Sequence, residues 1–194
     1  MKRFTPGPIL APAPRWRPLA QLAAPAEVTD WLADSGSLTH RLKKHGRFAV
    51  TPLRQQVAPP RPDEARLLGL RPRRAALIRE VILSLDGEPV VFARSILPLR
   101  SLSGANRVLG HMARRSLGAE LFRRPPARRA AVWGTCMPAS ALPHPIPGDL
   151  PSDSLLWGRQ SLFLKRRKPL LVAEIFLPHL WTITLPPAAS DSRR

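Results

Sequence analysis

Two charged residues stand in otherwise apolar stretches of the sequence. Glu174 is the single carboxylate of "KPLLVAEIFLP" (residues 168–178), and Arg79 falls within "LIREVILSL" (residues 77–85). Successive side chains of a β-strand point to opposite faces, so each charge belongs to a row of apolar neighbours. Burying an ionised side chain without a partner is very costly in free energy, so each group must pair, become neutral or face a cavity.

These two residues admit two interpretations. The first is a buried Arg79–Glu174 ion pair that belongs only to the scaffold, although an apolar pair of similar volume is often as stable. The second is a cavity in which the guanidinium binds a substrate carboxylate, while the carboxyl group meets a hydroxyl or ether oxygen. Arg94, in "FARSILP", is a third charge among apolar neighbours, and is a candidate accessory anion contact or a partly exposed residue.

The other reactive residues form no recognisable site. The five histidines show no metal-ligand spacing, and the glycines form no phosphate-binding loop. Cys136 is the only cysteine, which excludes an intrachain disulfide and fits a reducing cytoplasm. As a nucleophile Cys136 lacks an identifiable base. We therefore expect neither a metal nor an organic cofactor.

The strands that must position these residues are predicted in two hairpins. The first is "AALIREVILSLDGEPVVFARSILPL", in which Asp86-Gly87 is a strong turn signal. The second turns at "RRKP", between "LLWGRQSLFL" and "LLVAEIFLP". Two more strands are predicted in "RFAVTPLRQQV", where Pro52 indicates an edge or a bulge, and in "ARRAAVWGTCM".

Short helices are predicted between the strands. One begins near Pro25, one is capped by Ser37 and ends at Gly46, one lies in "SGANRVLGHMA", and one is capped by Ser116. The pattern predicts an α+β fold, a six-stranded antiparallel sheet flanked by helices that cover one side.

The length and composition favour one folded domain. The chain has 194 residues, of which 44% are hydrophobic and 24 are prolines. We assign residues 1–24 to a proline-rich N-terminal arm, 25–178 to the domain and 179–194 to a C-terminal tail. Prolines interrupt the N-terminal stretch, so we expect no signal peptide. No apolar run approaches the roughly 18 residues of a membrane span, so we expect no membrane insertion.

Four segments, taken together and in order, resemble the chorismate pyruvate-lyase family of bacteria: "SLTHRL", "LIREVILSLDGEPVVFARSILP", "SLGAELF" and "LWGRQSLFLKRRKPLLVAEIFLP". The resemblance implies a cytoplasmic, cofactor-independent enzyme that removes pyruvate from chorismate and leaves 4-hydroxybenzoate, the aromatic precursor of ubiquinone. It also implies a six-stranded antiparallel sheet with an internal ligand cavity closed by helical flaps. We expect a monomer.

The resemblance also implies roles for individual residues. Arg79 matches an arginine that binds the ring carboxylate of the substrate, and Glu174 matches an acidic residue near the 4-hydroxyl end. Leu38 and Leu117 match positions that contact the carboxylate through backbone N–H groups. A leucine side chain offers no polar atom, so such a contact has to come from the main chain.

Two other classes of function remain open. Effector domains of some bacterial transcription regulators resemble this fold and bind a ligand without changing it, but residues 1–46 hold too many prolines for a winged helix-turn-helix. A nucleic-acid-binding protein is suggested by the net charge of +18. The arginines are nevertheless scattered through every segment, without the interleaved aromatic residues of a base-stacking surface, so we expect no nucleic-acid partner.

Overall fold

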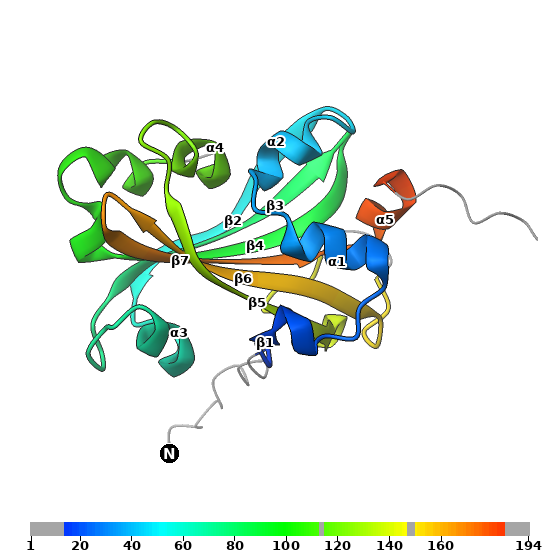
Figure 1. Cartoon of the computed structure of the whole chain (residues 1–194), viewed down its shortest axis with the longest axis horizontal. Coiled ribbons are helices and arrows are strands. Elements are labelled where there is room, and N and C mark those ends of the chain that lie inside the picture. Colours follow the sequence, from blue (N-terminus) through cyan, green and yellow to red (C-terminus); the bar gives the residue numbers. More distant parts are fainter. Residues whose placement is uncertain (1–13, 113–114, 147–149, 185–194) are drawn as a thin grey trace, which may run out of the picture.

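The fold is built on one antiparallel sheet (Figure 1). The computed structural model describes residues 14–112, 115–146 and 150–184. The seven strands lie in the order β1-β5-β6-β7-β4-β3-β2. Their bounds are β1 (Arg17–Pro18), β2 (Phe48–Ala58), β3 (Ala76–Leu85), β4 (Glu88–Pro98), β5 (Arg128–Pro138), β6 (Leu155–Lys165) and β7 (Lys168–Phe176).

The predicted α+β class with an antiparallel sheet is confirmed, but the number of strands differs. Six strands were expected, and the seventh is β1, whose residues Arg17 and Pro18 pair with Trp133 and Gly134 of β5. A strand of two residues cannot show the alternation by which strands are recognised in a sequence. The sheet therefore extends into the segment that was assigned to the N-terminal arm.

Both predicted hairpins are present. Asp86 and Gly87 join β3 to β4 with φ angles of 50° and 98°, and Arg166 and Arg167 join β6 to β7 with φ angles of 51° and 65°. Two successive residues with positive φ form the turn that matches the twist of antiparallel strands. Glycine adopts positive φ readily, whereas the two arginines adopt it at some cost in free energy.

The predicted edge position of Pro52 is also confirmed. β2 is the last strand of the sheet and pairs with β3 alone. The pairing register shifts between Pro52 and Arg54, which marks a β-bulge. Proline has no N–H group for a strand ladder, so an edge strand with a bulge accommodates it.

The helices are short. Their bounds are α1 (Ala26–Ala33), α2 (Leu38–Leu42), α3 (Pro62–Leu67), α4 (Leu117–Leu121) and α5 (Pro178–Thr184), with 3₁₀ turns η1 (Leu19–Gln21), η2 (Leu99–Leu102), η3 (Gly104–Gly110) and η4 (Ala139–Ala141). The predicted N-caps are confirmed, because the hydroxyl of Ser37 accepts from the N–H of His40 and that of Ser116 from the N–H of Ala119.

Two helix predictions need correction. The segment "SGANRVLGHMA" forms the 3₁₀ turn η3 rather than an α-helix, and α2 ends at Leu42 rather than near Gly46. The expectation that helices cover one side is also wrong, because α3 lies on the opposite side of the sheet from α2 and α4 (Figure 1). Six residues that begin at Pro62 are too few to show helical periodicity.

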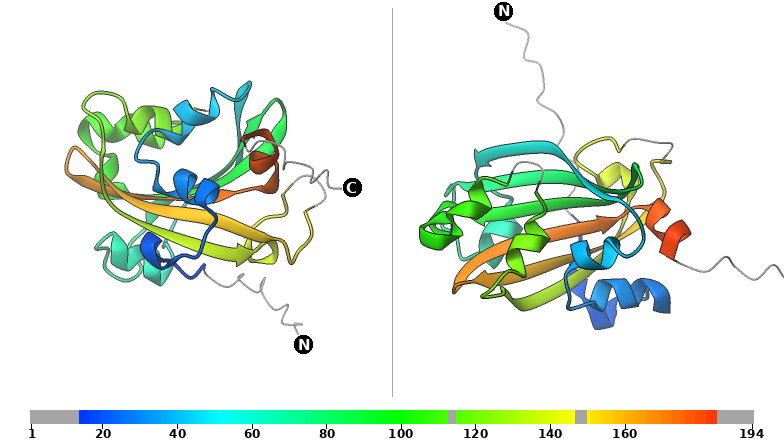
Figure 2. Two further views of the ribbon diagram at one scale, coloured as in Figure 1. Left: turned by 45° about the vertical axis from the view of Figure 1, so that its right-hand side comes forward. Right: turned by 90° about the horizontal axis from the view of Figure 1, so that it is seen from above.

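The two sides of the sheet are named here by their residues. The front face carries Arg79 and Val81 of β3 and is covered by α1, α2 and α4, as the view from above shows (Figure 2). The back face carries Ile78, Glu80 and Ile82 of β3 and packs against the segment after α3 and residues 139–142.

The apolar core of the front face is divided into two clusters. The α1 cluster consists of Val28, Trp31, Leu32, Leu38, Leu42, Val81, Leu83, Leu85, Val90, Val91, Ala93, Phe176 and Leu180. The α4 cluster consists of Leu77, Leu97, Leu109, Met112, Leu117, Leu121, Ala127, Phe163, Leu170 and Val172. The residues of the sheet that separate these clusters are polar, and they form the candidate site.

The ends of the chain are described only in part. In the assigned tail, α5 places the buried side chain of Leu180 in the α1 cluster. The predictions for residues 1–13 and 185–194 fall outside the described residues, and the assigned arm and tail stay predictions. Within the described ranges, no helix is long and apolar enough to cross a membrane.

Candidate functional site

A band of polar side chains crosses the front face between the α1 and α4 clusters. The band consists of Arg79 of β3, Ser95 of β4, Glu174 of β7, Arg159 and Ser161 of β6, and Arg129 of β5. Four of its members, Arg79, Ser95, Arg159 and Ser161, are at most 3% exposed. A buried row of charges and hydroxyls on a sheet weakens an apolar core, so it indicates a binding site.

Arg79 and Glu174 lie on the same face of the sheet, as the alternation pattern requires. Arg79 is opposite Ser95 of β4, Ser95 is opposite Val172 of β7, and Glu174 follows Val172 by two residues. Two strand spacings and two residue rises place the Cα atoms of Arg79 and Glu174 about 12 Å apart. With both side chains directed toward one side, this separation suits a small ring that carries polar groups at opposite ends.

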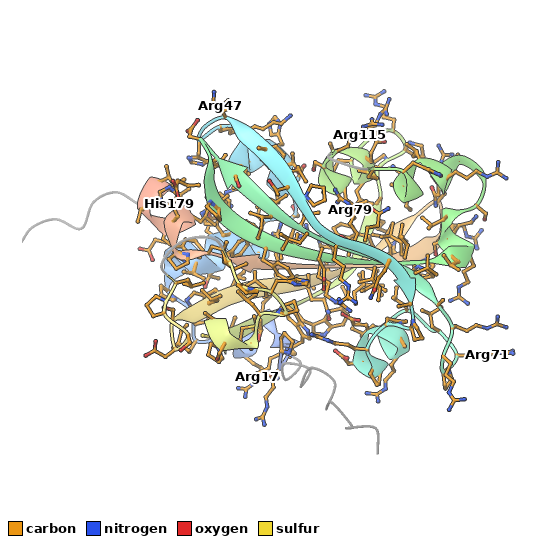
Figure 3. All side chains as sticks on the ribbon, turned by 180° about the vertical axis from the view of Figure 1, so that it is seen from behind. Arg17, Arg47, Arg71, Arg79, Arg115 and His179 are labelled. Atoms are coloured by element: carbon orange, nitrogen blue, oxygen red, sulfur yellow. The ribbon has the colours of Figure 1, made fainter. Side chains whose placement is uncertain are left out.

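Arg79 is linked to the segment that leads into α4. Its Nη2 donates to the carbonyl oxygen of Arg115 at 3.0 Å, and the two labelled residues lie near each other in Figure 3. Burial lowers the pKa of the Arg79 guanidinium below its usual value. A bound carboxylate would oppose that effect by stabilising the charged form.

Glu174 pairs with Arg159. The Nε of Arg159 donates to Oε2 of Glu174 at 2.6 Å, and the two residues are direct neighbours on β6 and β7. The Nη1 of Arg159 donates to the carbonyl oxygens of Trp31 at 2.9 Å and Asp34 at 2.8 Å. The ion-pair partner of Glu174 is therefore Arg159, and the proposed structural pair with Arg79 is not the one that forms.

Arg159 was not selected from the sequence, although a signal for it exists. In "LWGRQSLF" it shares its strand face with Trp157, Ser161 and Phe163. The same alternation that identified Arg79 and Glu174 places this cation on a largely buried row. This row is less apolar than the rows that contain Arg79 and Glu174, so the charge of Arg159 is less conspicuous in the sequence.

Arg129 lies on β5, next to β6, and like Arg159 it binds the segment that connects α1 to α2. Its Nη1 donates to the carbonyl oxygen of Asp34 at 2.6 Å, and its guanidinium lies over the ring of Phe163 at 5.1 Å. Burial and the nearby charge of Arg159 lower the pKa of Arg129. Among the described residues, neither Nε of Arg129 nor Oγ of Ser161 has a hydrogen-bond partner.

The N-terminal ends of α2 and α4 meet above the sheet. The hydroxyls of Thr39 and Ser116 are 2.5 Å apart, and a Cβ atom added to Gly118 would lie only 2.7 Å from Oγ1 of Thr39. Leu38 and Leu117 are the first residues of the two helices and are buried at 4% and 7% exposure. The structure thus places both predicted backbone contacts next to one junction between the helices.

A hollow of about 700 Å³ lies beside this junction. Its lining includes Lys43, the start of β2, Arg115, Ser116 and Glu120. Because Arg115 also supplies the carbonyl that binds Arg79, the hollow reaches the segment directly above the band. An enclosed cavity lined by both Arg79 and Glu174 stays a prediction.

The structure does not bring Arg94 to the band. Its side chain lies on the back face, where the guanidinium binds Glu64 at 2.7 Å and Glu80 at 2.5 Å. The Nε2 of His144 lies 2.7 Å from the other carboxylate oxygen of Glu80. Arg94 therefore belongs to a largely buried ionic network that connects α3 and the segment around His144 to the sheet.

Solved structures of known proteins share this fold at low sequence identity. One is the ligand-binding domain of a putative GntR-family transcriptional regulator from Bordetella bronchiseptica, with a TM-score of 0.55 and 20% identity over 69% of this chain and 84% of that one. Another is PhnF from Mycobacterium smegmatis, with a TM-score of 0.55 and 15% identity over 76% of this chain and 66% of that one. These similarities support the fold alone.

Other known proteins have much higher sequence identity to this chain than these structures have. A protein of Alcanivorax borkumensis named "Probable chorismate pyruvate-lyase" is 57% identical over 172 residues, which cover 89% of this chain and 79% of the relative. A protein of the same name from Aromatoleum aromaticum is 43% identical over 165 residues, which cover 79% of this chain and 86% of the relative. The family model for chorismate lyase matches residues 11–185. The chain belongs to the chorismate lyase family.

Proposed function

We propose that this protein is a chorismate pyruvate-lyase, which converts chorismate to 4-hydroxybenzoate and pyruvate. The observation that carries the proposal is the 57% identity to a relative of that name across most of the chain. The polar band supports it, because a buried guanidinium and a carboxylate on one sheet face suit a ring with a carboxylate at one end and a hydroxyl at the other.

Arg79 binds the ring carboxylate in this proposal. A guanidinium can donate two parallel hydrogen bonds to a carboxylate, which fixes the orientation of the ring as well as its position. The bond from Arg79 to the carbonyl oxygen of Arg115 orients the guanidinium from the side of α4. The backbone N–H groups of Leu38 and Leu117 assist, since the first N–H groups of a helix have no partner within the helix.

Glu174 meets the 4-hydroxyl or the ether oxygen. Among the described residues, the side-chain hydrogen bond of Glu174 is made by Oε2 alone, which leaves Oε1 for a substrate group. The side chain is 15% exposed, so it is more accessible than Arg159, which is 1% exposed. Glu174 acts either by holding the hydroxyl or, in its protonated form, by donating to the departing ether oxygen a proton that it recovers as the pyruvate carbonyl forms.

The reaction itself needs little from the protein. The C4–H bond and the C3–O ether bond break, the C4 hydrogen passes to the enolpyruvyl methylene carbon, and the ring becomes aromatic. Hydrogen transfer within the substrate balances the reaction without an external base, and aromatisation drives it. Orientation and charge stabilisation by the band supply the catalysis, so we propose that neither a metal nor an organic cofactor takes part.

The biological setting is proposed on the same basis. We place the enzyme in the cytoplasm as the source of 4-hydroxybenzoate for ubiquinone biosynthesis, acting as a monomer without a nucleic-acid partner. The net charge of +18 then attracts the dianionic substrate to the protein rather than serving a nucleic acid.

The test is turnover of chorismate by the purified protein after exhaustive chelation of metals. We expect equal amounts of 4-hydroxybenzoate and pyruvate, formed well above the spontaneous background. No product above that background would refute the proposal. A mock purification from the same host without the expressed protein serves as the control for a contaminating lyase.

A ligand-binding domain without catalysis is the second candidate. It is favoured by the fold similarity to the ligand-binding domain of a putative regulator from Bordetella bronchiseptica. The same experiment decides between the two, because a sensor would bind 4-hydroxybenzoate or chorismate and release it unchanged. Steeply salt-dependent binding to DNA or RNA, with no effect of chorismate, would instead point to a nucleic-acid-binding protein.

A further inference from the structure

Arg159 connects the carboxylate of the proposed site to the helical cover above it. One nitrogen of its guanidinium binds Glu174, and another binds the carbonyl oxygens of Trp31 and Asp34 at the end of α1. The planar guanidinium holds these nitrogens in a fixed relation, so the three contacts are made as a unit. With 1% exposure, Arg159 cannot exchange these partners for bulk water.

The contacts of Arg159 bear directly on the start of α2. Asp34 ends α1, and Leu38 begins α2 four residues later. The connection between them is held to the sheet by Arg159 and Arg129, which both donate to the carbonyl oxygen of Asp34. A shift of this connection would move the backbone of Leu38 and, through Arg159, the carboxylate of Glu174.

Arg129 provides an internal comparison for Arg159. It comes from the neighbouring strand β5, is half-buried, and holds the carbonyl oxygens of Asp34 and Gly36. Glu174, however, is bound by Arg159. Both arginines therefore hold the α1–α2 connection, but Arg159 also binds the carboxylate of Glu174.

We propose that Arg159 is a positioning residue that fixes the carboxylate of Glu174 and couples it to the α1–α2 connection. The inference deepens the proposed function and rests on it. The side chain of Glu174 has several freely rotating bonds, so without a partner its carboxylate would sample many positions. A bond from a rigid, buried guanidinium selects one of them before the substrate binds.

The test is a double-mutant cycle on single-turnover pyruvate release. Arg159→Lys keeps the charge but replaces two guanidinium nitrogens at fixed separation with one ammonium nitrogen on a flexible chain, which does not reproduce the geometry of the three contacts. Misplacement of a reacting group by about 1 Å can lower a rate by about 10²-fold. We expect a loss of that size in kcat with a smaller change in KM. In the Glu174→Gln background, Arg159→Lys should lower the rate further by no more than about threefold, because the group that it positions is gone.

Arg129→Lys is the matched control. It disturbs the same α1–α2 connection and keeps the positive charge near Glu174, and the hydrogen bond to Glu174 comes from Arg159, so the effect of Arg129→Lys should multiply with that of Glu174→Gln. If the effect of Arg159→Lys also multiplies with that of Glu174→Gln, Arg159 does not act through Glu174 and the inference is wrong.

A measurement without any Arg159 variant covers the case in which such variants do not fold. In the ¹⁵N spectrum of the parent protein, the Nε–H of Arg159 is recognisable by its proximity to Trp31, and its exchange with water should be slow. Glu174→Ala, which removes both acceptor oxygens, should accelerate this exchange at least tenfold and leave the Nε–H of Arg129 unchanged. Unchanged exchange at Arg159 would overturn the inference.

The failure of the inference and that of the proposed function are distinguishable. A parent protein that forms no 4-hydroxybenzoate refutes the function, and with it any role of Arg159 in turnover. A parent that turns over normally, but whose Arg159 and Glu174 variants act independently, refutes only the positioning role.

Discussion

Glu174 and Arg159 face each other across β7 and β6 in direct register, joined by a hydrogen bond of 2.6 Å. The carboxylate that stands out in an apolar strand thus has its charge partner on the adjacent strand. Arg79, two strands away from β7, contacts the segment before α4 through the carbonyl oxygen of Arg115. The two ends of the band are therefore connected to different parts of the helical cover, one to α1 and the other to α4.

Replacing Arg79 with lysine is expected to weaken ligand binding without unfolding the protein. A lysine offers a single flexible ammonium group in place of two fixed donors, so a carboxylate loses one charge-assisted hydrogen bond. We expect the affinity for both chorismate and 4-hydroxybenzoate to fall by about tenfold or more, which corresponds to the 1.5–3 kcal/mol of a hydrogen bond to a charged group. Isothermal titration with 4-hydroxybenzoate measures this directly.

The control for this experiment is Arg94→Lys. Arg94 is also an arginine with little exposure, 13% of its side chain, on the neighbouring strand, but its guanidinium binds Glu64 and Glu80 on the back face. Its replacement should lower thermal stability and leave the affinity unchanged. Equal affinities of Arg79→Lys and the parent would assign Arg79 to the scaffold.

Glu174→Gln separates a chemical role of the carboxyl group from a structural one. The amide oxygen can still accept from Arg159, so we expect the loss of unfolding free energy to stay near 1–3 kcal/mol. Single-turnover pyruvate release should fall by about 10²-fold or more if the carboxyl group transfers a proton, and much less if it only holds the hydroxyl.

The two measurements on Glu174→Gln are read together. A loss of about 3–5 kcal/mol is typical of a broken buried ion pair. If the variant loses that much stability while its folded fraction turns over normally, Glu174 serves Arg159 and the scaffold rather than the substrate.

Gly118→Ala probes the junction between α2 and α4. The added Cβ would lie 2.7 Å from Oγ1 of Thr39, so the hydroxyl contact between Thr39 and Ser116 must give way. Loss of one such hydrogen bond corresponds to about a 2- to 10-fold faster dissociation of 4-hydroxybenzoate, measured by stopped flow. Thermal stability should change little, because alanine in a helix is about 1 kcal/mol more favourable than glycine.

Gly110→Ala is the matched control for Gly118→Ala. Its added Cβ would meet only the side chain of Leu102, at an ordinary contact distance of 3.7 Å. Dissociation of 4-hydroxybenzoate should remain at the parental rate. Equal rates for both variants would show that the junction does not govern release.

Glu80 should make the stability of the fold depend on pH in the acidic range. Burial alone would raise the pKa of Glu80, but the hydrogen bonds and charges of His144 and Arg94 lower it below the usual value of 4.5. A carboxyl group whose pKa is lower in the folded state than in the unfolded state stabilises the fold at pH values above its unfolded-state pKa. This contribution is lost as the pH falls through its folded-state pKa.

Chemical unfolding of the parent and of Glu80→Gln, from neutral pH down through pH 4.5 and below, tests this expectation. The difference in unfolding free energy between the two proteins should be greatest near neutral pH and should shrink on acidification. A difference that does not change with pH would contradict the assignment.

Much of the sheet could be predicted because its signals are local. Asp86-Gly87 specifies a tight turn by itself, and alternation along β3 fixes which of its residues face the front. Pro52 likewise indicates an edge strand from its own chemistry. In contrast, β1 and α3 are too short for any periodic pattern. β1 pairs with β5, and Glu64 of α3 binds Arg94 of the sheet, so both elements depend on partners that are distant in the sequence.

The site could be predicted in its residue types but not in its pairings. Alternation placed Arg79 and Glu174 on buried rows, and the register confirms that the rows share a face. Which charge binds which is set by strand order, and β6 lies beside β7 whereas β3 lies beyond β4. The sequence alone does not specify that order, so the pairing of Glu174 with Arg159 was missed. Arg94 lies on the back face because the β3–β4 register shifts between Leu83 and Ser84, and this bulge has no signal in the alternation pattern.

The bulge at Pro52 has a consequence for how the protein behaves in a crowded solution. An outermost strand normally offers a free row of N–H and C=O groups to which a strand of another molecule can add. Pro52 removes one donor from that row, and the register shift before Arg54 interrupts the spacing that an incoming strand would need. β2 is therefore a poor template for edge-to-edge aggregation, and at high concentration this irregularity keeps neighbouring molecules from joining their sheets.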